Sequence, residues 1–90
     1  MKVTKSVPTT EPGRTIEIGH PTWDQDSSAY SVRSRRQNSN GGFKRGSPEI
    51  PIGDVSSIVE AIAQEDLLPP VEIATMIAAL AGSLSRQLNR

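Results

Sequence analysis

The chain has 90 residues, of which 34% are hydrophobic and 3% aromatic, and its ten basic and ten acidic residues give a formal net charge of zero. A chain so short and so poor in apolar side chains buries little surface on folding, and usually needs a disulfide, a metal or a partner to stabilise it. Because the sequence contains no cysteine, disulfides and thiolate metal sites are excluded, and a partner is the stabilising factor that the composition favours.

Residues 1–50 are expected to form a mostly disordered or extended arm. Prolines and glycines interrupt this half and its long apolar side chains occur singly, so it is not expected to bury enough surface to offset the entropy of ordering. Residues 14–18 alternate polar and apolar as a strand does, but the flanking sequence predicts no strand to pair with them, which leaves the sheet edge of another protein as a partner. Eight basic and five acidic residues give this half a charge of +3, whereas residues 51–90 carry −3.

The basic segment of this arm, residues 33–45, is the candidate for contact with a polyanion or an acidic partner. Flexible arginines gain affinity for phosphate by releasing counterions. Against this, five basic residues are few for a nucleic-acid arm and the pI of about 6.6 is low for a dedicated binder, so a solvated linker and an acidic protein groove remain alternatives. The predicted contact residues are Arg33, Arg35, Arg36, Lys44 and Arg45.

Three aromatic side chains in the same half are candidate anchors. Trp23 is suited to fill a pocket on a partner, and Tyr30 and Phe43 lie on either side of the first three arginines of the basic segment, where they would stack on unpaired bases. The alternative is that they are isolated surface aromatics of the kind that most proteins carry.

No set of residues matches a catalytic or metal site. The single histidine, His20, precedes Pro21 in the arm, where no scaffold is predicted to hold a nucleophile and an acid beside it. Asp24 and Asp26 lack the glycine and the distal glutamate of a calcium loop, and the glycines of residues 41–46 do not form a phosphate-binding loop. We therefore expect no enzyme activity, no cofactor and no metal.

Residues 51–90 are predicted to form a small all-α module, a hairpin of two helices at about 54–65 and 70–88. Asp54 is suited to cap the first helix, and Pro70 suits the first turn of the second. Apolar residues recur at helical spacing along both, and we predict that they form an interaction face. These residues are Val55, Ile58, Val59, Ile62, Ile73, Ile77, Leu80, Leu84 and Leu88.

A second row on the later helix holds small side chains. Ala74, Ala78 and Gly82 lie four residues apart, a spacing that lets another helix approach closely, although alanine is also simply a strong helix former. Gly82 favours the packing explanation, because a glycine within a helix costs about 1 kcal/mol relative to alanine. The uninterrupted apolar stretch, residues 73–84, is too short to cross a bilayer, so no membrane span is expected.

The sequence therefore predicts a non-catalytic structural or assembly protein that docks on or threads through a larger complex of protein subunits, or self-associates. A viral or phage particle is the first candidate for that complex. The alternatives are a small nucleic-acid-binding regulator that uses residues 33–45, and an inhibitor that binds a single host enzyme through Trp23 and the arm. With no cysteine and no signal peptide, a cytoplasmic or virion-associated protein is expected.

Overall fold

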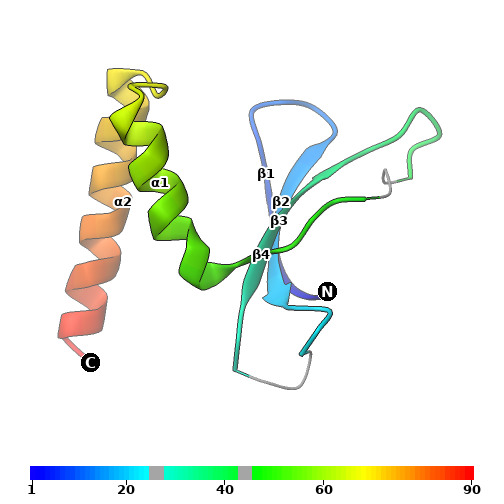
Figure 1. The fold of residues 1–90 in the computed structure, drawn as a ribbon, viewed down its shortest axis with the longest axis horizontal. Coiled ribbons are helices and arrows are strands. Elements are labelled where there is room, and N and C mark those ends of the chain that lie inside the picture. Colours follow the sequence, from blue (N-terminus) through cyan, green and yellow to red (C-terminus); the bar gives the residue numbers. More distant parts are fainter. Residues whose placement is uncertain (25–27, 43–45) are drawn as a thin grey trace. The chain divides into compact units, whose positions relative to one another are not determined.

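The computed structural model describes residues 1–24, 28–42 and 46–90. The chain divides into two compact units, a sheet unit of residues 1–56 and a helical unit of residues 57–90. The elements, labelled in Figure 1, are the strands β1 (Lys2–Pro8), β2 (Arg14–His20), β3 (Ser31–Arg36) and β4 (Ile50–Pro51), the 3-10 turn η1 (Ile52–Asp54), and the helices α1 (Val55–Gln64) and α2 (Pro70–Leu88).

The four strands form one antiparallel sheet in the order β1-β2-β3-β4. The register places Glu17 opposite Arg33 and Ile18 opposite Val32, and residues that are directly opposite each other point to the same face. One face is therefore polar, with Glu17 of β2 beside the arginines of β3. The other face is apolar along its middle and carries Ile16, Ile18, Val32 and Ile50.

The expectation of a mostly disordered or extended arm over residues 1–50 is wrong. Residues 14–18, which were expected to lack a pairing strand, belong to the central strand β2, and β1 and β3 hydrogen-bond to its two sides. Residues 33–36 of the basic segment belong to β3. The sequence pattern failed here because β1 is exposed throughout and β3 is rich in arginine, so backbone ladders and ion pairs, and not burial, hold these strands.

The prolines and glycines that suggested disorder include residues that form turns between strands. In the connection from β1 to β2, the Arg14 N–H donates to the Glu11 carbonyl at 3.2 Å. Pro12 and Gly13 lie between them, and Gly13 has a φ of 79°, as the third residue of a type II turn requires. The turn therefore needs the two residue types that also mark unstructured segments.

Two helices follow the sheet. Asp54, which was expected to cap the first helix, lies instead in η1, which leads directly into α1. α1 ends at Gln64, and the chain leaves it through Asp66, whose φ is 52°. The Leu67 N–H donates to the Ile62 carbonyl and the Asp66 N–H donates to the Ala63 carbonyl. These are the bonds of a Schellman motif, with aspartate in the position that glycine usually takes.

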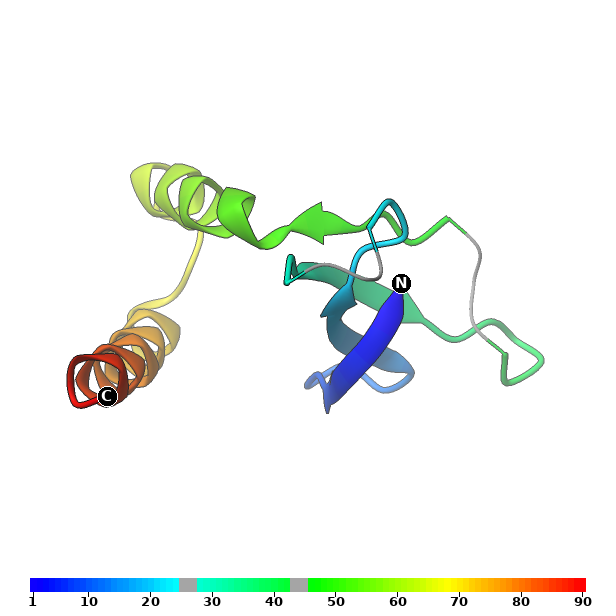
Figure 2. The same ribbon diagram turned by 90° about the horizontal axis from the view of Figure 1, so that it is seen from below.

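α2 begins with Pro70 in its first turn, as predicted, and the Asn89 N–H caps its other end at the Ser85 carbonyl. Figure 2 shows α1 and α2 as separate rods joined by a short connection, and neither helix buries a residue. The two helices therefore form a loosely packed pair instead of a closed hairpin.

A conventional hydrophobic core is missing from the described part of the chain, where no aliphatic or aromatic side chain of the Ala, Val, Ile, Leu, Met, Trp or Tyr type is buried. Among the side chains of the described residues, those of Pro21 and Ser31 are fully buried, and Glu17 is 8% exposed. In the described part of the single chain, the apolar residues on the sheet face are thus only half-buried, and those along α2 are mostly exposed.

Candidate functional site

The predicted interaction face of the helices is exposed. On α2, Ile77, Leu80 and Leu84 are 58–63% exposed, and Ile73 and Leu88 are exposed as well. On α1 the apolar residues are better covered. Val55, Val59 and Ile62 are half-buried and Ile58 is exposed. The exposed part of the face therefore lies mainly on α2.

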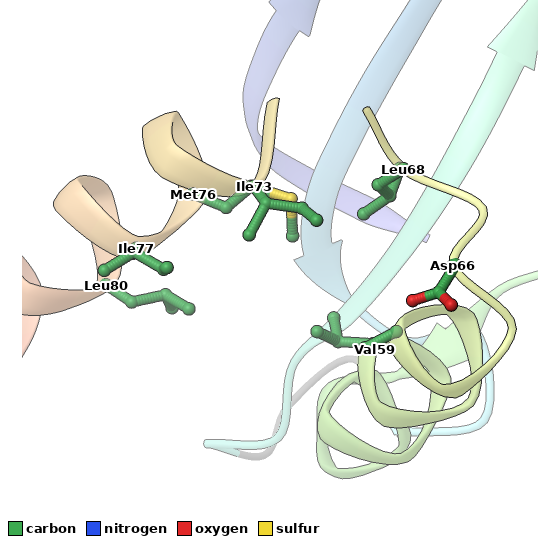
Figure 3. Close-up of a pocket in the computed structure, with 8 residues that line it drawn as sticks. Val59, Asp66, Leu68, Ile73, Met76, Ile77 and Leu80 are labelled. Atoms are coloured by element: carbon green, nitrogen blue, oxygen red, sulfur yellow. The ribbon is translucent and has the colours of Figure 1, made fainter. Parts of the chain in front are cut away.

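A cavity of about 120 Å³ lies in the helical unit, between α1, the connection and α2 (Figure 3). Four residues of the predicted interaction face line it, together with apolar residues outside that face, among them Leu68. Leu68 stands in the connection, where helical periodicity carries no signal. The lining residues are Val59, Ala63, Asp66, Leu68, Ile73, Met76, Ile77 and Leu80.

The row of small residues on α2 lies on a different side of the helix. Ala74 and Ala78 are exposed, and Gly82 is half-buried. A Cβ at Gly82 would lie 3.4 Å from the Arg86 Nη1 atom, so this side chain extends along the helix over the glycine. Within the helical unit, the neighbour of Gly82 is thus an arginine of its own helix.

The arginines of the basic segment make ion pairs within the sheet unit. Arg33 donates from Nε to the Glu17 Oε1 atom at 2.6 Å, and Arg35 Nη1 lies 3.7 Å from the same oxygen. Arg36 Nη1 lies 3.6 Å from the Glu11 Oε1 atom. Each arginine of β3 therefore lies near a carboxylate of its own chain, and two carboxylates, Glu17 and Glu11, serve the three arginines.

Two further predicted contact residues of this segment, Lys44 and Arg45, lie outside the described residues, as does the predicted anchor Phe43. Trp23 and Tyr30 are exposed at 59% and 42%. The Tyr30 ring lies against His20, with 4.8 Å between the ring centroids. His20 Nδ1 lies 2.9 Å from the Ala29 carbonyl oxygen, to which it donates, so the histidine is held as part of the sheet unit.

A cluster around Glu49 is a feature that the sequence analysis did not find. The Glu49 carboxylate accepts a hydrogen bond from the Thr22 hydroxyl at 2.5 Å and another from the Thr22 N–H at 3.0 Å, and the Met1 ammonium lies 3.6 Å away. The hydrogen bond from the Thr22 hydroxyl is the main cause that holds the pKa of Glu49 below its ordinary value of 4.5, against the opposing effect of burial. Thr22 and Glu49 are too far apart in the sequence for any local pattern to pair them.

Comparison with protein-family models, with curated proteins and with solved structures finds no match. Function has to be inferred from the geometry above.

Among the described residues, no three His, Asp or Glu side chains gather closely enough to hold a metal ion. In the same part of the chain, no helix combines the length and the apolar character that crossing a bilayer requires.

The lowered pKa of Glu49 predicts a pH dependence of stability. Because the folded-state pKa is below the unfolded one, the ionised carboxylate stabilises the fold, fully so above the unfolded pKa near 4.5, and this contribution is lost as the pH falls through the folded pKa. Urea unfolding between about pH 7 and pH 3, which includes the range over which carboxylates titrate, should therefore show a shallower loss of stability for Glu49→Gln than for the unmodified chain. Thr22→Val, which removes the main donor, should flatten the profile in the same direction. Identical slopes for all three proteins would contradict this role of the cluster.

Proposed function

We propose that this chain is a non-catalytic assembly protein that acts as a subunit of a protein complex. The observation that carries the proposal is that no Ala, Val, Ile, Leu, Met, Trp or Tyr side chain is buried among the described residues, although apolar side chains are gathered on one face of the sheet and along α2. Burial of apolar surface is the dominant favourable term in folding and in most protein association. A surface of another subunit would supply the burial that the single chain lacks.

The free energy that burial of the exposed α2 side chains would contribute supports this proposal. Fully burying a leucine or isoleucine side chain contributes about 1.5–3 kcal/mol. Four α2 side chains that are roughly half exposed would therefore gain on the order of 3–6 kcal/mol from a partner. Since an entire domain is stable by about 5–15 kcal/mol, association would be a major part of the stability of this protein.

Sedimentation equilibrium and thermal unfolding of the full chain test the proposal. The mass should exceed the 9.7 kDa of one chain, and the Tm should rise over roughly a hundredfold increase in concentration, because association stabilises only the folded state. A cooperative Tm that does not change with concentration, in a chain that sediments as a monomer, would contradict the proposal.

Leu80→Asp should weaken this association by at least about tenfold, which corresponds to about 1.4 kcal/mol, because it places an unpaired charge in an apolar contact. Thr75→Asp is the matched control. Thr75 is exposed on the opposite side of the same helix, and the same charge there should leave the association constant within about a factor of three. Equal effects of the two variants would show that the apolar side of α2 is not the contact surface.

A second candidate function, binding of single-stranded nucleic acid by the sheet, is favoured by a different observation. His20 and the exposed Tyr30 form a ring pair, and the register places Lys2 opposite His20 and Lys5 opposite Ile18, on the same face. In the described part of the chain, Lys2 and Lys5 form no ion pair, unlike the arginines of β3. Aromatic rings beside unpaired cations are the means by which proteins stack bases and hold phosphates.

Fluorescence anisotropy with a labelled oligothymidylate at several salt concentrations tests this second candidate. Affinity should fall with salt, and the double variant Lys2→Gln/Lys5→Gln should reduce the slope of log K against log salt by about one to two units. Absence of binding at low salt would dismiss the candidate and leave the assembly proposal unaffected.

A further inference from the structure

We infer that the partner of α2 is a second copy of this chain, packed antiparallel against it about a two-fold axis. The inference rests on the proposed function, because it names the subunit that covers the apolar side of α2. The surface concerned is the α2 stripe, which consists of Ile73, Ile77, Leu80 and Leu84.

The spacing of the α2 stripe is self-complementary. The four residues follow one another at intervals of four, three and four, which places them on one side of the helix, and this series reads the same in both directions. In an antiparallel pair, Ile73 therefore lies opposite the partner's Leu84, and Ile77 lies opposite the partner's Leu80. Each contact occurs twice, as a two-fold interface requires. The same four residues thus supply both sides of the contact.

The charges of α2 agree with this arrangement. Its charged residues, Glu72 near the beginning and Arg86 near the end, both lie outside the stripe. A charge within the stripe would stand close to the like charge of its own copy and repel it. Antiparallel packing also brings the acidic end of one α2 to the basic end of the other and opposes the two helix dipoles.

The cavity of the helical unit continues the same surface. Ile77 and Leu80 line it from α2, and Val59 lines it from α1 (Figure 3). A helix laid along the α2 stripe would therefore cover the cavity as well, and would bury residues of both helices. This accounts for the loose packing of α1 and α2 in the single chain.

Disulfide trapping tests the register, because the chain has no cysteine of its own. Full-length Ile73→Cys and Leu84→Cys chains are mixed in equal amounts, equilibrated in a glutathione redox buffer and separated without reduction. A disulfide requires Cα atoms about 4.4–6.8 Å apart. The antiparallel pair satisfies this between the two variants, whereas in a parallel pair the two positions would be on the order of 16 Å apart along the helix axis.

The mixed disulfide should exceed the half share expected from random pairing. Thr75→Cys mixed with Gly82→Cys is the matched control, since these positions share the same centre of symmetry but lie off the stripe, and they should not cross-link above the random share. A share of like-variant disulfides of half or more, or equal cross-linking of the control pair, would overturn the inference.

Sedimentation of the same chains distinguishes a failure of the antiparallel pairing from a failure of the proposed assembly function. Assemblies larger than one chain without the mixed disulfide would overturn the antiparallel pairing and leave the assembly function standing. A stable monomer with a concentration-independent Tm would overturn both.

Discussion

Glu17→Gln should lower the free energy of unfolding of the sheet unit by about 1–3 kcal/mol, whereas Glu11→Gln should change it by less than about 1 kcal/mol. Glu17 is 8% exposed and lies 2.6 Å from Arg33 and 3.7 Å from Arg35. A glutamine of similar shape would leave two arginines on the polar face of the sheet without their counter-charge. Removing one partner of a poorly solvated pair is costly, because the remaining charge stays out of water without compensation.

Glu11 is the matched control because it also pairs with two arginines, Arg14 and Arg36, but its side chain is 51% exposed. Solvent and salt screen such pairs, and they contribute little to stability. Urea unfolding followed by the fluorescence of Trp23, the single tryptophan, reports on the sheet unit. Equal losses for the two variants would mean that total charge, and not the Glu17 contacts, stabilises the sheet.

The two helices were predictable because their information is local. Apolar residues recur at intervals of three and four, and Pro70 marks the start of α2, so a short window of sequence contains the whole signal. The start of α1 was less predictable, since Asp54 has the chemistry of a cap but lies in a 3-10 turn. The α2 stripe follows from the same local period, although its exposure became visible only in the structure.

The sheet could not be predicted in this way because its stabilising contacts join distant residues. Glu17 of β2 pairs with Arg33 of the neighbouring strand β3, and Thr22 bonds Glu49, which is 27 residues further along the chain. In the sequence, these residues look like the scattered charges of a solvated segment. Glu17 and Arg33 can be recognised as partners only once the register of β2 and β3 is known. A polar strand held by its neighbours has the composition of a disordered one, and composition alone cannot separate the two.

Gly19→Ala should have a comparably large effect, lowering the free energy of unfolding of the sheet unit by about 1–3 kcal/mol. Gly19 lies in β2, where β1 approaches closely next to the irregular pairing between Val3 and Lys5. A Cβ at this position would overlap the Lys2 carbonyl oxygen and lie 2.8 Å from the Val3 Cα atom. Both are backbone atoms, so no side-chain rotation relieves the clash, and β1 must move away from β2.

The Gly19→Ala substitution should destabilise β1 locally as well as lower the free energy of unfolding of the sheet unit. Amide hydrogen exchange should accelerate most along β1 in the Gly19→Ala chain, while the β2–β3 ladder keeps more of its protection, because β1 is the edge strand next to β2 in the sheet of the described residues. Gly53→Ala is the matched control. A Cβ at Gly53 would meet no atom within 4 Å, so the substitution should be neutral or stabilise the chain by up to about 1 kcal/mol through the entropy of the unfolded state. If both alanine variants unfold like the unmodified chain, β1 does not pack on β2 at Gly19 as the structure describes, and the apolar face of the sheet would have to be formed without it.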